Sequence, residues 1–428
     1  MPKRPHIYPP EYLDLPLTLH TDRHKLEDAD VPVVTISASF KRQIAEERGE
    51  VAKDFDEIVF SRAHYSMARA ITEEAKRKNL TSWLVDPTNF VSPREWKILE
   101  GTERIGEIVA RFPVLNKIKN FLDPIIRSKL PISEAVREPL TYVTFRTKKP
   151  IISLHYESGN ILATLGKEVL QVVTDPHVRP RYLDQCERKN IRFAVFDNKT
   201  KEDFLALARE LGKTVSHKRI FVTGPPVDPR IVKCRLEKKP YKGNRPLRVV
   251  ITTSGLGTNK GEIKSALVSL IPGIRTKKVE VLLYASTHPD FKELFEEILV
   301  ENKVKSGAKI IYHRSIVDAN EDLIKKGFPW ADCFITKPSG DMAYDAAASG
   351  AFFLTLEPWG EWEINVRKVF EDLGISRRAE PERVFTQLEH LIESGWARGA
   401  GEKAQKLDSL FLEGAKKIVD LQQKLRLQ

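Results

Sequence analysis

Short apolar runs alternate with amphipathic, helix-like segments along most of the chain. Helix-type spacing is clearest at Met67–Arg77, Lys201–Leu211 and Phe291–Leu299, and a second series of strands starts at Leu247. Strands that alternate with helices are typical of parallel, doubly wound sheets, so the pattern predicts an α/β fold. The predicted strands are Val31–Ser39, Glu57–Phe60, Trp83–Val85, Ile151–His155, Leu170–Thr174, Arg192–Phe196, Leu247–Thr252, Lys278–Ala285, Ala308–Tyr312 and Ala331–Ile335.

The length of 428 residues favours two α/β domains over a single core. The segment Cys234–Pro246 is polar and basic and contains Pro and Gly, which predicts a linker. We therefore expect an extended N-terminal arm over residues 1–30, an N-terminal domain over 31–240 and a C-terminal domain over 241–400. Residues 401–428 are predicted to form a helix with an apolar stripe suited to docking. The apolar residues recur at three- and four-residue steps and are Leu407, Leu410, Phe411, Gly414, Ile418, Leu421 and Leu425.

Composition narrows the class of protein. With 41% hydrophobic and 30% charged residues, the chain reads as a soluble globular protein. A formal net charge of +11 suits phosphorylated ligands, anionic membranes or nucleic acid, although no nucleic-acid-binding module is recognisable. The three cysteines are far apart, which argues against a metal site and fits a reducing cytoplasm. Because no apolar run could span a bilayer and no signal peptide is recognisable, a cytoplasmic location is expected.

The segment after Ala331–Ile335 carries the clearest candidate chemistry. Ser339, Gly340 and Asp341 form a turn before an alanine-rich, helix-like stretch that Gly350 is suited to end. A strand that leads through a turn into a helix directs backbone N–H groups and the positive end of the helix dipole at one point, which attracts anions. Asp345 could accept hydrogen bonds from hydroxyl groups of the same ligand. A ribose-containing nucleoside diphosphate would satisfy both features, whereas the alternative is an ordinary βα turn.

A second small-residue loop follows the predicted strand Leu247–Thr252. It contains Ser254, Gly255, Gly257 and Thr258. Small residues let the backbone approach a phosphate closely, and successive N–H groups can surround it. Many βα loops contain two glycines, so this pattern alone is weak.

The run Thr336–Ala346, followed by Gly350, Pro358 and Gly360–Asn365, resembles the donor-nucleotide signature of one group of GT-B glycosyltransferases. This group includes monogalactosyldiacylglycerol synthase, the processive diacylglycerol glucosyltransferases and the lipid-I N-acetylglucosaminyltransferase of peptidoglycan synthesis. The resemblance implies two Rossmann-like domains facing a cleft, with a C-terminal helix over residues 401–428 that packs back toward the N-terminal domain. It also implies a UDP-sugar donor as substrate, and no metal or other cofactor. The donor-binding residues that it implies are Ser254, Gly255, Gly257, Thr258, Lys337, Ser339, Gly340, Asp341, Asp345, Glu361, Glu363 and Asn365.

The same resemblance points to two candidate catalytic residues, His64 and Asp175. The segment that contains His64 is similar to the family's Gly-x-Gly-His element, but Ser61 and Ala63 replace the two glycines. Histidine is a natural general base at neutral pH. Asp175 follows a predicted strand, as in the family's Thr-Asp element, where it could act as the base or orient His64. The alternatives are a helix-start histidine and a turn-forming Asp-Pro pair.

The resemblance implies transfer of a sugar from a UDP-sugar to a hydroxyl group of a lipid or glycolipid at the cytoplasmic face of a membrane. The segment Arg111–Lys129 mixes apolar and basic residues, which predicts peripheral binding to anionic lipid, whereas the alternative is an ordinary surface helix. Two other functions stay open. One is a nucleotide-sugar epimerase of the same fold, and the other is a catalytically degenerate protein that still binds a nucleotide sugar.

Overall fold

The computed structural model describes residues 15–37, 61–91 and 132–427. Contacts divide the chain into two compact units, which are described separately. The first unit consists of Met1–Pro226 and Glu413–Gln428, and the second consists of Val227–Leu412. The predicted strand Glu57–Phe60 and the segment Arg111–Lys129 lie outside the described residues.

The first unit contains a parallel sheet with the strand order β2-β1-β3-β4-β5-β6. The order reverses between β1 and β3, so the carboxyl ends of these two strands form the switch point of this sheet. Its strands are β1 (Val31–Val34), β2 (Ser82–Val85), β3 (Ile151–Ser153), β4 (Val169–Val172), β5 (Ile191–Val195) and β6 (Ile220–Val222).

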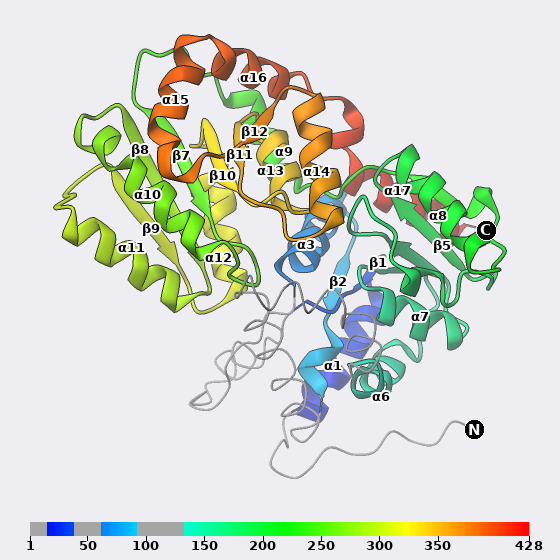
Figure 1. Ribbon diagram of the computed structural model, residues 1–428. Coiled ribbons are helices and arrows are strands. Elements are labelled where there is room, and N and C mark those ends of the chain that lie inside the picture. Colours follow the sequence, from blue (N-terminus) through cyan, green and yellow to red (C-terminus); the bar gives the residue numbers. More distant parts are fainter. Residues whose placement is uncertain (1–14, 38–60, 92–131, 428) are drawn as a thin grey trace. The chain divides into compact units, whose positions relative to one another are not determined.

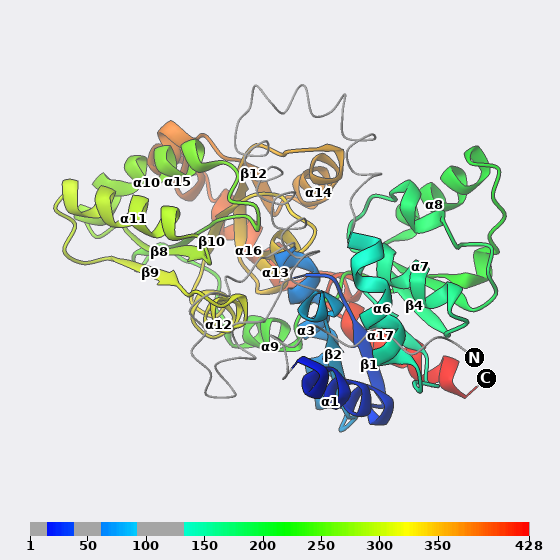
Figure 2. The same ribbon diagram turned by 90° about the horizontal axis from the view of Figure 1, so that it is seen from below.

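Helices cover the faces of this sheet (Figures 1 and 2). The α-helices are α1 (Leu15–Asp28), α3 (Arg62–Arg77), α6 (Ile132–Thr144), α7 (Tyr156–Thr164), α8 (Asn198–Glu210) and α17 (Gly414–Arg426). Short 3-10 turns are η2 (Pro87–Phe90), η3 (Pro180–Leu183) and η4 (His217–Arg219). The aromatic pair Phe193 and Phe204 lies in the core between β5 and α8, with ring centroids 4.5 Å apart.

The expectation of an extended arm over residues 1–30 is wrong for Leu15–Asp28, which forms α1. Leu19 and Leu26 are buried, and α1 packs against α6 and β2. The Trp83 indole N–H also donates to the Asp22 carboxylate at 3.0 Å. Contacts with distant segments stabilise this helix, and the local sequence does not reveal them.

The C-terminal segment is not one continuous helix. It contains α16 (Trp396–Gln405), η7 (Ser409–Phe411) and α17, and the first two belong to the second unit. Within the first unit, α17 packs against α3 and β1. The buried Gln422 side chain donates to the backbone oxygen of Pro150 at 2.9 Å, which satisfies a carbonyl beside the start of β3.

The second unit contains a parallel sheet with the strand order β12-β11-β10-β7-β8-β9. Its order reverses between β7 and β10, as in the Rossmann arrangement in which ligands bind at the carboxyl ends of the two central strands. Its strands are β7 (Leu247–Thr252), β8 (Val279–Ser286), β9 (Ala308–Tyr312), β10 (Cys333–Thr336), β11 (Phe352–Thr355) and β12 (Ser376–Arg378). The prediction of two doubly wound, parallel α/β domains is confirmed.

Helices also cover both faces of the second sheet (Figures 1 and 2). Besides α16 and η7 they are α9 (Pro229–Glu237), α10 (Lys260–Arg275), α11 (Pro289–Glu301), α12 (Ile316–Asp322), the π-helical turn η5 (Leu323–Gly327), α13 (Met342–Ala348), α14 (Glu361–Asp372), η6 (Pro381–Arg383) and α15 (Val384–Glu393). None of the helices in the described ranges combines the length and the apolar character of a membrane-spanning segment.

The predicted linker Cys234–Pro246 is wrong at its beginning, because α9 extends to Glu237. Asp228 caps this helix by accepting a hydrogen bond from the backbone N–H of Arg230, and Pro229 occupies the first helical turn. Ile231 and Cys234 are buried, and α9 packs against α13. Its apolar face makes α9 part of the second unit.

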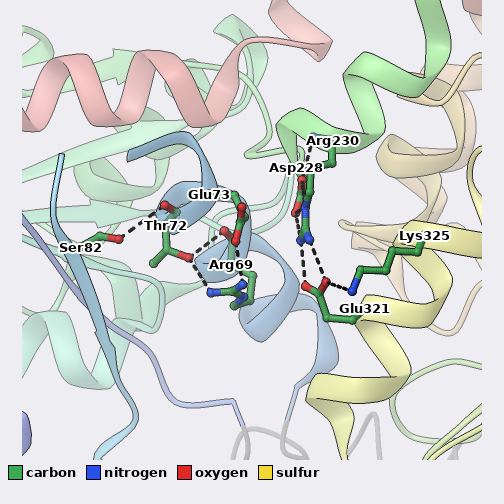
Figure 3. A network of polar contacts seen from close by, with 8 residues as sticks. All are labelled: Arg69, Thr72, Glu73, Ser82, Asp228, Arg230, Glu321 and Lys325. Carbon is green, nitrogen blue, oxygen red and sulfur yellow. Dashed lines mark hydrogen bonds and ion pairs between the residues drawn. The ribbon is translucent and has the colours of Figure 1, made fainter. Parts of the chain in front are cut away.

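Figure 3 shows a polar network in each unit. In the first unit, Arg69 donates to Glu73 at 2.8 Å and to Thr72 at 3.2 Å along α3. In the second unit, the Arg230 guanidinium donates to both Glu321 oxygens at 2.8 and 2.9 Å and also contacts Asp228. Burial lowers the pKa of Arg230, but the hydrogen bonds to the Asp228 and Glu321 carboxylates outweigh burial and raise this pKa above its ordinary value. The bidentate pair joins the start of α9 to α12.

Candidate functional site

The predicted donor-binding residues of the second unit lie at the switch point of its sheet. The loop with Ser254 to Thr258 follows β7, and Lys337 to Asp341 follow β10. Because β7 and β10 are hydrogen-bonded neighbours, their loops leave the sheet side by side. The Thr252 hydroxyl donates to the Thr336 hydroxyl at 2.7 Å, which joins the two strand ends directly.

Lys337 is the centre of this site. Its ammonium group lies 2.9 Å from a carboxylate oxygen of Glu363 and donates to the Thr258 hydroxyl at 3.2 Å. The Lys337 and Glu363 side chains are only 7% and 4% exposed. The ammonium also lies 5.2 Å from the centre of the Trp359 ring, close enough for a cation–π contact. Three segments that are far apart in the sequence therefore converge on one buried cation.

The loop after β7 is held in one conformation by its own side chains. The Ser254 hydroxyl accepts from the backbone N–H of Thr258 at 2.9 Å and lies 2.9 Å from the Thr258 hydroxyl. Gly257 has a φ of +61°, a conformation that favours glycine. Ser254 is not in the left-handed region, so the backbone tolerates serine there. The adjacent Gly255 is half-buried.

Ser339 and Asp341 shape the turn that follows β10. The Ser339 hydroxyl donates to the Asp341 carboxylate at 2.7 Å and accepts from the backbone N–H of Met342 at 3.2 Å. The sequence suggested that the N–H groups at the start of α13 could face an anion. The N–H of Met342 is instead already hydrogen-bonded within the turn. Gly340, between these two residues, is buried.

Asp345 lies on α13 and is 4% exposed. The helix ends where the pattern predicts, because Ser349 caps it and Gly350 follows with a φ of +79°. A Cβ atom at Gly350 would lie 2.6 Å from the Gln405 amide nitrogen, so a larger residue would not fit there without a shift.

The remaining predicted donor-binding residues are on α14, which begins after Gly360. Glu361 is exposed, Asn365 is half-buried, and Glu363 is buried. The second oxygen of the Glu363 carboxylate accepts from the backbone N–H of Trp359 at 2.6 Å. Glu363 thus uses both of its oxygens within the protein, one on Lys337 and one on the loop before α14.

In the first unit, His64 lies in the first turn of α3. Its Nδ1 atom is 3.2 Å from the backbone oxygen of Ile36, just beyond β1, and its Nε2 atom is 3.0 Å from the Thr174 hydroxyl, just beyond β4. The Ser61 hydroxyl caps α3 by accepting from the backbone N–H of His64 at 3.3 Å. The serine that replaces a family glycine therefore has a local role as a helix cap.

Asp175 follows Thr174 directly. Its side chain is 20% exposed and lies 3.9 Å from the Arg179 guanidinium. The structure thus brings the two catalytic candidates to the same edge of one sheet. The hydrogen bond on His64 Nε2 runs to Thr174, the neighbour of Asp175.

His155 is a half-buried neighbour of His64 just beyond the end of β3. The His64 and His155 rings meet edge to face with centroids 5.3 Å apart, and the centroids of the His155 and Tyr156 rings are 4.3 Å apart. The His155 Nδ1 atom accepts from the backbone N–H of Glu157 at 3.2 Å and caps α7. Burial, together with the nearby His64 and Arg179, lowers the pKa of His155 well below its ordinary value, so this ring is neutral at pH 7.

Several residues of these sites were missed by the sequence reasoning. Trp359 contacts Lys337, the His288 ring lies 3.0 Å from the Ser254 backbone oxygen, and Asn259 has a φ of +63° at the start of α10. His155 is a further example. His155 and His288 both follow a strand of a parallel sheet, and that position is the signal that could have identified them.

The carboxyl-end edges of the two sheets differ in the chemistry that their side chains can perform. The second unit offers a buried ammonium group beside two small-residue loops, which suits an anion such as a diphosphate. The first unit offers an imidazole and a carboxylate, either of which could accept a proton. In the described parts of the chain, no group of three or more His, Cys, Asp or Glu side chains could hold a metal ion.

Comparisons with known proteins support the fold. No protein-family model and no curated protein matches the chain. A co-structure of S. aureus MnaA with UDP has a TM-score of 0.52 at 12% identity and covers 86% of this chain and 95% of that one. A UDP-glucosyltransferase from Polygonum tinctorium has a TM-score of 0.50 at 11% identity, covering 94% and 100%. A UDP-GlcNAc 2-epimerase from Neisseria meningitidis, bound to UDP-GlcNAc, has a TM-score of 0.50 at 13% identity, covering 92% and 98%. The chain therefore has the GT-B architecture, two Rossmann-like units with parallel sheets, which it shares with glycosyltransferases and with an epimerase.

Proposed function

We propose that this protein is a glycosyltransferase that moves a sugar from a UDP-sugar to an acceptor hydroxyl group. The observation that carries the proposal is the convergence of Thr258, Lys337 and Glu363 at the switch point between β7 and β10. All three are among the donor-binding residues that the family resemblance implies, and a switch point is where doubly wound sheets bind nucleotides.

In this proposal the second unit binds the donor. The Lys337 ammonium and the loop N–H groups after β7 stabilise the negative charge that develops on the departing diphosphate. Asp345 accepts hydrogen bonds from the ribose hydroxyls. A buried lysine already paired with Glu363 is prepositioned, so little reorganisation is needed when the charge develops.

The first unit supplies the base. His64 or Asp175 accepts the proton of the acceptor hydroxyl, whose oxygen forms the new bond to the anomeric carbon as the bond to the diphosphate breaks. The acceptor that we propose is a lipid or glycolipid at the cytoplasmic face of a membrane. That choice rests on the family resemblance and on the basic, partly apolar segment Arg111–Lys129.

The test is product analysis with a panel of UDP-sugars, each incubated with and without diacylglycerol, glycolipid and polyprenyl-linked acceptors. Sugar transfer to an acceptor, together with release of UDP, supports the proposal. A panel that yields neither transfer nor UDP release, while calorimetry shows tight UDP binding, contradicts it and favours the degenerate binding protein.

An epimerase is the second candidate, because an epimerase bound to UDP-GlcNAc has the same architecture as this chain at a TM-score of 0.50. An epimerase needs no acceptor. Conversion of a UDP-sugar into its epimer in the acceptor-free half of the panel would therefore identify this activity and exclude the transferase.

A further inference from the structure

The Thr174 hydroxyl group lies between His64 and Tyr182 and contacts both side chains. The Thr174 hydroxyl oxygen lies 3.0 Å from His64 Nε2 and 3.2 Å from the Tyr182 hydroxyl. Tyr182 also accepts from the backbone N–H of Thr174 at 3.3 Å. Thr174 and Tyr182 are 3% and 4% exposed, so these contacts are shielded from bulk water.

The contacts of His64 indicate which ring nitrogen carries the hydrogen when the imidazole is neutral. Nδ1 faces the backbone oxygen of Ile36 at 3.2 Å, and a carbonyl oxygen can only accept a hydrogen bond. The hydrogen of the neutral ring is therefore on Nδ1, and Nε2 is the acceptor that faces Thr174. The His155 ring packs edge to face against the His64 ring.

We propose that Thr174 is a positioning residue for His64. Its hydroxyl donates a hydrogen bond to Nε2 and thereby keeps Nε2 as the proton-accepting atom until an acceptor hydroxyl takes its place. This inference rests on the proposed function and selects Nε2 of His64 as the base. The Thr174 hydroxyl stands in the place of the acceptor hydroxyl, because both would donate to the same lone pair.

The exchange between the two donors requires the Thr174 hydroxyl to turn away from Nε2, which frees the lone pair for the acceptor hydroxyl. When the acceptor hydroxyl donates to Nε2, the Thr174 hydroxyl turns to the Tyr182 oxygen, which is the other partner within reach. Burial raises the pKa of Tyr182 to about 12, so its hydroxyl stays neutral and remains a suitable partner. In the transfer step the acceptor O–H bond breaks and its proton binds Nε2. The acceptor oxygen bonds to the anomeric carbon, and the diphosphate leaves with the electrons of the bond that it had to that carbon.

His155 contributes to the same arrangement. A second protonated imidazole 5.3 Å away would oppose a proton on His64, but the half-buried His155 ring accepts from the Glu157 backbone N–H and has a lowered pKa. A neutral neighbour leaves His64 able to take up a charge.

The experiment compares Thr174→Val, which keeps the shape and removes the hydroxyl, with Thr174→Ser, which restores it. Thr144→Val is the matched control, since Thr144 is also a buried threonine of the first unit whose hydroxyl donates only locally, to Leu140 at 2.7 Å. In wild-type protein with ¹⁵N-labelled histidine, the His64 signals, identified by their loss in His64→Asn, should show hydrogen on Nδ1 and a hydrogen-bonded, unprotonated Nε2. In Thr174→Val the ¹⁵N chemical shift of Nε2 should move toward that of an unprotonated nitrogen that accepts no hydrogen bond.

Turnover should fall about tenfold in Thr174→Val, the equivalent of one ordinary hydrogen bond, with KM for the donor unchanged. Thr174→Ser and Thr144→Val should stay within about twofold of wild type, a change of less than about 0.5 kcal/mol. Hydrogen on Nε2 of His64 in the wild type, or unchanged turnover in Thr174→Val, would overturn the inference. A wild type that turns over no donor contradicts the proposed function instead. The nitrogen spectra would then still support or overturn the Thr174–His64 contact on their own.

Discussion

At the switch point of the second sheet, the central contact is a buried ion pair between Lys337 and Glu363, whereas at that of the first sheet His64 is surrounded by a backbone carbonyl, a threonine hydroxyl and a neutral histidine. Both sites occupy the position where a doubly wound sheet binds ligands. The same architecture therefore supports a charged environment in one unit and a largely neutral one in the other.

The difference follows from what each site would bind. An anionic diphosphate needs a cation, and a buried cation needs a partner when no ligand is present, which Glu363 provides to Lys337. An acceptor hydroxyl is neutral, and a base that must take up its proton works best without neighbouring positive charge. In the first unit the charged pair Asp175 and Arg179 is more exposed than the pair Lys337 and Glu363 of the second unit, with side chains 20% and 28% exposed.

The largest expected effect separates chemistry from donor binding. If the first unit carries the base, His64→Ala should lower turnover by ~10²–10⁴, typical for loss of a general base, without weakening UDP affinity. His217→Ala, at an exposed histidine of the same unit, is the control and should have no effect. Asp175→Ala is measured in parallel, and near wild-type rates for both the His64 and Asp175 variants would show that neither is the base.

The second-largest effect is expected on stability, when the buried ion pair between Lys337 and Glu363 is broken. Lys337→Met leaves the Glu363 carboxylate buried without its cation, which typically costs about 3–5 kcal/mol of unfolding free energy. Denaturant unfolding measures this loss. Lys368→Met, which removes an exposed ion pair with Asp372 on the same helix as Glu363, should change stability little. Equal stability of the two variants would mean that the buried ion pair contributes no more to the unfolding free energy than the exposed one.

A smaller effect is expected for Asp345, which tests whether the second unit binds a ribose. Asp345→Ala should weaken UDP binding by about 1–3 kcal/mol, the range for a hydrogen bond to a charged group. Calorimetry on folded variants provides the measurement, with Asp345→Asn as the near-isosteric comparison. Unchanged UDP affinity in Asp345→Ala would remove Asp345 from the donor site.

The smallest effect concerns the proposed membrane acceptor and rests on the sequence of Arg111–Lys129, which lies outside the described residues. Each basic residue near an anionic surface contributes about 1 kcal/mol. Co-sedimentation should show binding to anionic vesicles, weak binding to neutral vesicles and release by salt. Replacing Lys117 and Lys119 by Glu should remove most of this binding. Equal partitioning of variant and wild type would favour a soluble acceptor.

The α/β pattern was readable from the sequence because strands of parallel sheets are short apolar runs bounded by turn residues. The bounds predicted for β7 and β9 match the structure, and the helix of the donor signature ends at Gly350 as expected. By contrast, α1 and α9 were missed, because their stability comes from packing against α6, β2 and α13. Local composition does not record such contacts.

For the candidate sites, the sequence by itself determined which residue types are available and that several of them follow strands of a parallel sheet, where ligands bind. Only the tertiary structure decided their partners. His64 meets a hydroxyl 110 positions away in the chain, and Lys337 meets one 79 positions away. Hydrogen-bond partners, burial and the resulting pKa changes depend on which strands become neighbours. Strand order is set by the packing of the whole unit, whereas sequence spacing reports only on neighbours along the chain.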